Sequence, residues 1–157
     1  MGRVVIIMGS KADLEWSEMI EGVLEELGVE VIKRVSSAHK TPLRCIEIIR
    51  EYEGEGVVFI AVAGRSNALG GFVDAQTDCP VITCPPYSDS FGGTDIYSSL
   101  RMPSSVAPLV ILEPEGAAIA AAKILGIREE SLRQGVAEYQ RASKERIERD
   151  DREVTGG

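Results

Sequence analysis

Short hydrophobic runs recur along the chain and are separated by stretches in which apolar and polar residues mix. The runs occupy residues 3–8, 57–62, 81–83 and 109–112, and residues 29–35, which include three charged residues, are interpreted as a further strand. Runs of this length without a regular polar alternation are typical of strands whose two faces are both covered. We therefore expect five parallel strands in one sheet that is covered by helices on both sides.

Hydrophobic residues at three- and four-residue spacing predict helices between these strands. The stripe in residues 16–27 ends at Gly28, and glycine is a common helix terminator. Pro42 suits the first turn of a second helix. Two further helices are predicted near the end of the chain, an alanine-rich one over residues 117–125 and a long, highly charged one over residues 128–153.

Strands that alternate with helices predict an α/β fold, because a parallel strand pair needs a crossover connection. We expect a three-layer, doubly wound parallel sheet of flavodoxin-like type with a C-terminal helical extension. A chain of 157 residues corresponds to one domain. We therefore expect a single domain over residues 1–157, in which residues 128–157 form a helical tail.

Small and polar residues follow each of the first three predicted strands, in residues 9–13, 36–41 and 63–69. In doubly wound folds, ligands bind beyond the carboxyl ends of the strands. The three loops should therefore line one crevice. Residues 85–105 hold three prolines, two glycines and seven serines or threonines. We expect a short helix there, capped by Asp95, in a segment that is functional or lies at an interface.

Composition restricts the possible function. The net charge of −8 argues against a nucleic-acid-binding protein, which needs a basic face. The most apolar late segment falls well short of the ~20 residues that a membrane span requires. The three cysteines, Cys45, Cys79 and Cys84, form neither a CxxC pair nor a disulfide framework. Together with a start that lacks the features of a signal peptide, this predicts reduced thiols and a cytoplasmic location.

His39 is the only histidine of the chain and lies in the second of the three loops. Imidazole ordinarily titrates near neutrality, so this residue is the first candidate for proton transfer. A loop histidine without a chemical role fits the pattern equally well. A single histidine also excludes metal sites that need two.

Other polar residues of these loops have both functional and structural interpretations. Asp13 can bind ribose hydroxyls or cap the following helix. Lys40 can pair with a phosphate or be solvated, and Arg65 can bind a carboxylate or form a salt bridge between subunits. Cys84 is a weak candidate for a nucleophile, because nothing near it in the sequence activates a thiol.

Six motifs together match a known family, although each alone is weak. They are MGSKAD at residues 8–13, SAHKTP at 37–42, AGRSN at 63–67, CPP at 84–86, SSLRMP at 98–103 and PEGA at 114–117. In this order they resemble the aminoimidazole ribonucleotide carboxylases of purine biosynthesis, over essentially residues 4–126. The resemblance implies a carboxy-lyase that needs no cofactor and holds no metal.

The family that the chain resembles has two branches. In class I, a mutase acts on N5-carboxyaminoimidazole ribonucleotide, and its third loop carries a second histidine. In class II, 5-aminoimidazole ribonucleotide (AIR) is carboxylated directly and reversibly at C4 by CO2, without ATP or biotin. The third loop here, Gly64-Arg65-Ser66-Asn67, holds no histidine and resembles class II. Class I activity is the alternative.

The resemblance also assigns roles to residues. His39 resembles the general acid and base that handles the proton on C4. Ser66 and Asn67 would hold CO2 or the new carboxylate, with the backbone of residues 64–69. The implied substrate-binding residues are Ser10, Asp13, Ser37, Lys40, Gly64, Ser66, Asn67 and Leu69.

Two pairs of these residues would bind the remainder of the substrate. Ser10 and Asp13 resemble residues that hold the ribose phosphate portion, while Ser37 and Lys40 match the loop around phosphate and imidazole. The implied partners are therefore AIR and CO2, in a homo-octamer without nucleic acid or membrane. A flavodoxin-like module that binds flavin mononucleotide (FMN) and a regulatory nucleotide-binding oligomer are more distant alternatives.

Overall fold

A computed structural model describes residues 2–156. The strands are β1 (Arg3–Met8), β2 (Glu30–Val35), β3 (Val58–Val62), β4 (Val81–Thr83) and β5 (Leu109–Val110). The helices are α1 (Leu14–Glu26), α2 (Pro42–Tyr52), α3 (Ala68–Asp74), α4 (Tyr97–Leu100), α5 (Pro114–Leu125) and α6 (Glu130–Thr155). Three short 3-10 turns are η1 (Lys11–Asp13), η2 (Glu53–Glu55) and η3 (Thr94–Ile96).

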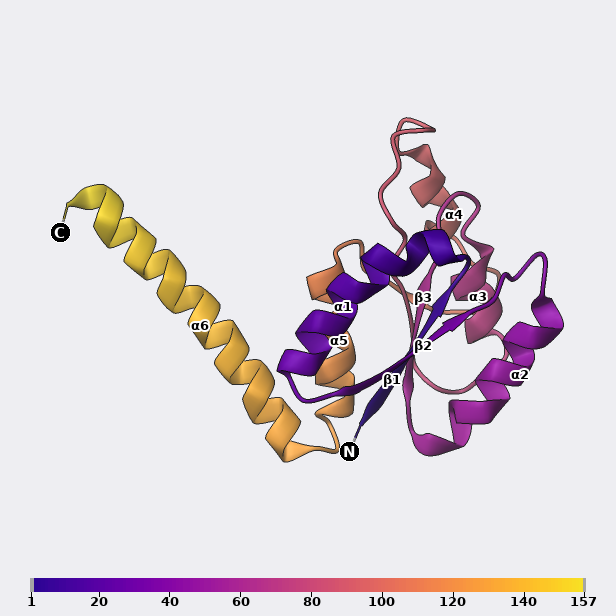
Figure 1. The fold of residues 1–157 in the computed structure, drawn as a ribbon, viewed down its shortest axis with the longest axis horizontal. Coiled ribbons are helices and arrows are strands. Elements are labelled where there is room, and N and C mark those ends of the chain that lie inside the picture. Colours follow the sequence, from indigo (N-terminus) through magenta and orange to yellow (C-terminus); the bar gives the residue numbers. More distant parts are fainter. Residues whose placement is uncertain (1, 157) are drawn as a thin grey trace.

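All five strands pair in parallel, in the order β2-β1-β3-β4-β5. This is the flavodoxin-like order, which confirms the predicted fold. Helices α1 and α5 cover one face of the sheet, and α2 and α3 cover the other (Figure 1). The order of the strands reverses between β1 and β3, so a crevice is expected where these two strands end.

Successive side chains of the central strands point to opposite faces of the sheet, so the core has two halves. In β1, Val4 and Ile6 pack with α1 and α5, whereas Val5 and Ile7 pack with α2 and α3. All four side chains are fully buried, which explains why the sequence of β1 shows no polar alternation. Small residues bring α5 close to α1 and the sheet, because its buried face consists largely of alanines.

The sequence analysis missed helix α3. This helix has seven residues and includes Gly70 and Gly71, so it has neither the length nor the hydrophobic period that would indicate it. Several predicted boundaries also shift by one to three residues; for example, α5 begins at Pro114 and β5 ends at Val110. Asp95 does not cap a helix. It lies inside η3, and no side-chain hydrogen bond caps either η3 or α4.

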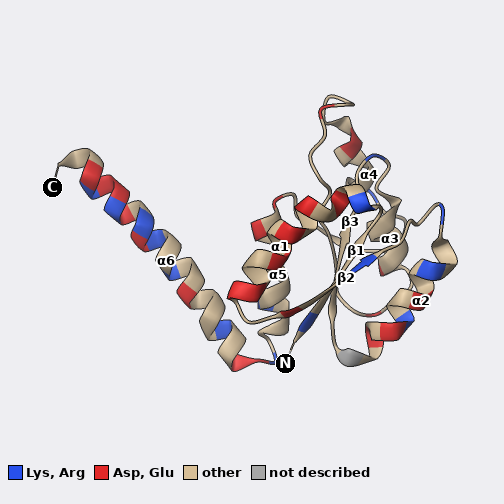
Figure 2. Ribbon diagram, in the orientation of Figure 1, with Lys and Arg blue, Asp and Glu red and all other residues tan. Residues whose placement is uncertain are grey.

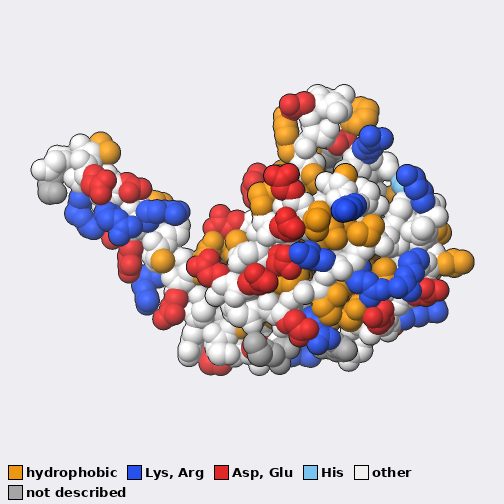
Figure 3. Space-filling model, viewed as in Figure 1, with side chains coloured by type: hydrophobic (Ala, Val, Ile, Leu, Met, Phe, Trp, Pro, Cys, Tyr) orange, Lys and Arg blue, Asp and Glu red, His pale blue; other side chains and the backbone are white. Residues whose placement is uncertain are grey.

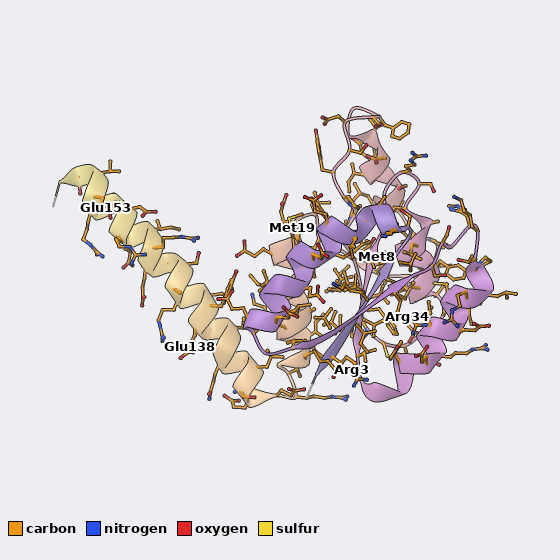
Figure 4. The ribbon with its side chains drawn as sticks, in the orientation of Figure 1. Arg3, Met8, Met19, Arg34, Glu138 and Glu153 are labelled. Carbon is orange, nitrogen blue, oxygen red and sulfur yellow. The ribbon has the colours of Figure 1, made fainter. Side chains whose placement is uncertain are left out.

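Helix α6 extends away from the rest of the molecule (Figure 1). Within it only Leu132 and Val136 are buried, near its start. Both signs of charge alternate along its length (Figure 2), and Glu138 and Glu153 lie on the projecting part (Figure 4). Among the described residues, no helix is both long and apolar enough to cross a membrane.

Replacing Gly70 with alanine should destabilise the fold, because a Cβ there would lie 2.7 Å from both Cβ and Oγ1 of Thr83 on β4. We expect the free energy of unfolding to fall by about 1–3 kcal/mol, the usual cost of overpacking a core. Urea denaturation measures this loss. Gly71→Ala is the matched control, since the close contacts of its Cβ would be with the flexible thioether of Met102, and Val106 Cγ1 would lie at an ordinary 3.8 Å. Equal losses in both variants would contradict the argument.

Candidate active site

The three loops converge as expected at the carboxyl ends of β1, β2 and β3. The backbone N–H of Gly9 donates to the carbonyl oxygen of Val62 at 2.9 Å, and that of Ser36 donates to the carbonyl oxygen of Met8 at 2.9 Å. The hydrogen-bond ladder of the sheet therefore continues into the loops. Between the loops lies a cavity of about 400 Å³. It is lined by Gly9, Ser10, Ala12, Asp13, Ser37, Ala38, His39, Lys40, Ala63, Gly64, Arg65, Ser66, Asn67, Ala68 and Leu69. Every site residue expected from the sequence is among them.

The first loop is fixed by a reciprocal pair of hydrogen bonds. The Ser10 hydroxyl accepts from the backbone of Ala12 at 3.2 Å, and the Asp13 carboxylate accepts from the backbone of Ser10 at 3.1 Å. Such a capping box satisfies backbone donors at a helix start. Burial raises the pKa of Asp13, and the hydrogen bonds from Ser10 oppose that rise. Asp13 is therefore the carboxylate of the capping box around η1 and lines the cavity, but its side chain does not cap α1, which the sequence analysis gave as its structural alternative.

The second loop is held by its own hydroxyl groups. Thr41 Oγ1 accepts from the backbone of Ser37 at 2.9 Å, and Ser37 Oγ accepts from the backbone of Lys40 at 3.2 Å. Ser36 is buried and bonds to Thr41 as well. These contacts leave the side chains of His39 and Lys40 exposed at the tip, on the rim of the cavity. A rigid loop thus presents an imidazole and an ammonium group to a ligand.

The third loop adopts an unusual backbone. Arg65 has φ +58° and Asn67 has φ +33°, in the left-handed region that side chains other than that of glycine seldom occupy. The side chain of Asn67 is only 3% exposed. Its Nδ2 donates to Thr83 Oγ1 at 3.0 Å and to Ser99 Oγ at 2.5 Å. Both amide hydrogens are therefore occupied within the protein.

Asn67 borders the cavity, but the two donors of its side chain face Thr83 and Ser99. The expected contact of Asn67 with CO2 or the new carboxylate stays a prediction. Leu69 is also buried, so it contributes its backbone position rather than an exposed side chain. Thr83 and Ser99 were missed, because they lie far from the loop along the chain. The only signal for Ser99 was its place in the SSLRMP motif.

Charges around the cavity favour an anionic ligand. Lys40 and Arg65 are cationic and Asp13 is the single acidic residue among those that line it. This local balance contrasts with the net charge of −8 for the whole chain. Figure 3 shows that acidic and basic side chains are interspersed over much of one face of the molecule. Within the described part of the chain, no cluster of three or more metal-ligating side chains is present.

Cys84 is unsuitable as a nucleophile. Its side chain is fully buried, and its Sγ lies 3.8 Å from the carbonyl oxygen of Leu112, to which it donates. Burial raises the pKa of Cys84 to about 11, so the thiol stays protonated at neutral pH. Cys84 also does not line the cavity that contains His39. The structure therefore gives no support to Cys84 as a nucleophile that His39 could activate.

Comparison with known proteins identifies relatives of this chain. The family model described as AIR carboxylase matches residues 3–146. Phosphoribosylaminoimidazole carboxylase of Archaeoglobus fulgidus is 54% identical, over 97% of this chain and 84% of the relative. The protein of the same name from Treponema denticola is 43% identical, over 94% of both chains.

A solved structure shows the same fold. The crystal structure of Treponema denticola PurE is 42% identical and superimposes with a TM-score of 0.95. The match covers 98% of this chain and 99% of the other. The family model and these relatives each match most of the chain. The chain belongs to the AIR carboxylase family.

Proposed function

We propose that this chain is a class II AIR carboxylase, which adds CO2 to C4 of AIR and catalyses the reverse decarboxylation. One observation carries the proposal. The only imidazole of the chain lines a cavity of about 400 Å³ together with the third loop and the cationic residues Lys40 and Arg65. Relatives that match nearly the whole chain bear the name phosphoribosylaminoimidazole carboxylase.

The chemistry requires little beyond position and one proton acceptor. The aminoimidazole ring is an electron-rich enamine, so its C4 attacks the carbon of CO2 and a C–C bond forms. One C=O π pair of CO2 becomes a carboxylate lone pair. His39 then removes the proton from C4, which restores the aromatic ring. In the reverse direction, His39 returns this proton and CO2 leaves.

The remaining side chains would bind and orient the reactants. Lys40 supplies a positive charge for the ribose phosphate, and Ser37 lies beside it in the same loop. Ser10 and Asp13 bind the ribose phosphate portion from the first loop. Holding CO2 against C4 converts a bimolecular encounter into a positioned one, which lowers the entropic barrier.

The third loop would hold CO2 or the new carboxylate. Ser66 and the backbone from Gly64 to Leu69 border the cavity, and Arg65 adds a positive charge. A carboxylate that forms there gains from donors placed before the reaction. This loop carries no histidine, which favours direct carboxylation over the mutase reaction. Asn67 belongs to the loop chiefly through its hydrogen bonds inside the protein.

We further propose that the chain functions as a homo-octamer. Residues 85–105 expose large apolar side chains, those of Tyr87, Phe91, Tyr97 and Leu100. Ile147 on the projecting part of α6 is 65% exposed as well. Apolar surface of this kind is usually covered by another chain. The number of eight rests on the family resemblance.

Location and organisation complete the proposal. The three cysteines are free, which fits a reducing compartment, and we propose that the protein is cytoplasmic. Residues 1–157 would act as a single catalytic domain with residues 128–157 as a helical tail. Tyr139 of this tail donates a hydrogen bond to Glu115 at 3.1 Å. This bond joins the tail to the first turn of α5.

Supplying AIR with bicarbonate and no ATP should give 4-carboxy-AIR, because C4 is nucleophilic enough to attack CO2 unaided. Formation of the product is followed by its ultraviolet absorbance. In a parallel reaction, N5-carboxyaminoimidazole ribonucleotide should not be a productive substrate. Turnover of this second compound alone would exclude class II and favour the mutase.

His39→Asn should abolish turnover while the protein still binds AIR, since asparagine offers no proton acceptor of suitable basicity. We expect the rate to fall by roughly a hundredfold or more, in line with the usual contribution of general acid–base catalysis. Binding is measured by calorimetry with AIR. A variant that retains most of its activity would contradict the assigned proton transfer.

Light scattering should give a mass about eight times that of the 17.0 kDa chain. Ile147→Lys should lower this mass, because a charge would then enter an apolar contact between copies. Glu148→Lys, at the neighbouring exposed position, is the matched control and should assemble normally. A wild-type protein with the mass of a single chain would refute the octamer.

A further inference from the structure

Two consecutive serines of the short helix α4 contact the two left-handed residues of the third loop. Ser99 bonds to the side chain of Asn67, and Ser98 bonds to the backbone of Arg65. We propose that Ser98 and Ser99 form a clamp that holds this loop in the conformation that positions CO2. The serine clamp rests on the proposed carboxylase function and assigns a role to part of the SSLRMP motif.

Ser99 provides the stronger arm of the clamp. Its Oγ accepts from Asn67 Nδ2 at 2.5 Å, and the same nitrogen donates to Thr83 Oγ1 at 3.0 Å. The three residues are between 0% and 3% exposed, so water does not replace a lost partner. An unpaired buried donor carries the full cost of its desolvation. Asn67 is therefore held between β4 and α4.

Ser98 provides the weaker arm. Its Oγ lies 3.2 Å from the carbonyl oxygen of Arg65 and 2.8 Å from that of Asp95. A hydroxyl group has one proton, so these two acceptors share it. The contact nevertheless reaches the peptide group between Arg65 and Ser66. The two arms thus hold the loop on either side of Ser66.

The backbone of the loop explains why it needs a clamp. Arg65 at φ +58° and Asn67 at φ +33° occupy a region that is costly for residues with a Cβ. Within the loop, the backbone of Asn67 donates to Gly64 at 3.2 Å. A conformation of this kind persists only where surrounding contacts fix it. Ser98, Ser99 and Thr83 provide such contacts.

The clamp should act on CO2 more than on AIR. Ser66, between the clamped residues, borders the cavity with the loop backbone. CO2 is uncharged and a weak hydrogen-bond acceptor, so its productive binding depends on how well the loop is placed. The expected phosphate and ribose contacts come from the first two loops, which the clamp does not touch. Loosening the clamp should therefore raise the KM for CO2 while it leaves the KM for AIR nearly unchanged.

Steady-state kinetics of Ser99→Ala and Ser98→Ala test this proposal. Ser99→Ala should raise the KM for CO2 by roughly tenfold, with KM for AIR within about twofold of wild type. Ser98→Ala should raise the KM for CO2 by a smaller factor. Ser104→Ala, an exposed serine of the same segment, is the matched control and should leave both values unchanged.

Hydrogen–deuterium exchange provides a second readout that needs no turnover. Amides of residues 64–69 should exchange faster in Ser99→Ala than in wild type and Ser104→Ala. If Ser99→Ala fails to fold, Ser98→Ala, whose side chain is only partly buried, decides both measurements.

Two patterns of results distinguish the possible failures. Unchanged exchange together with an unchanged KM for CO2 overturns the clamp, even if the melting temperature falls. A wild-type protein that does not carboxylate AIR refutes the proposed function. In that case the exchange of residues 64–69 still decides whether the serines hold the loop.

Discussion

The parallel pairing of β1 with β3 is the constraint on which the site depends. These strands are buried on both faces, and their register places Met8 beside Val62. The chain must leave both strands at the same edge of the sheet, and β2 ends there as well. The hydrogen bond from Gly9 to Val62 keeps the first loop against the base of the third. The pairing of the strands therefore brings three loops that are distant in sequence together around one cavity.

Much of this arrangement follows from the sequence alone, because it depends on patterns that repeat. Apolar runs identified most of the strands, although the segment of β2 includes three charged residues, and the parallel topology then placed the loops together. Helix α3 was missed since its seven residues include two adjacent glycines, which have low helix propensity. It forms because tertiary packing overrides that propensity. The close approach of Gly70 to Thr83 shows why a glycine is required there.

The residues of the cavity could be predicted, but their individual roles could not. Asn67 illustrates the difference. Its position in the third loop predicted that it would border the site, and it does. The direction of its amide depends on Thr83 and Ser99, which lie 16 and 32 residues away along the chain. No local pattern encodes such a partner. Asp13 likewise lines the cavity as expected, while its carboxylate bonds to the backbone of Ser10 instead of capping α1.

The position of α4 links the site to the surface of the molecule. Tyr97, which is 70% exposed, immediately precedes Ser98 on this single turn of helix. A neighbouring copy that packs on Tyr97 would thus press on the same turn that holds Arg65 and Asn67. Assembly and catalysis would then share one rigid element. For such an enzyme, dilution below the dissociation constant of the assembly lowers the activity of each chain, so protein concentration itself enters the rate law.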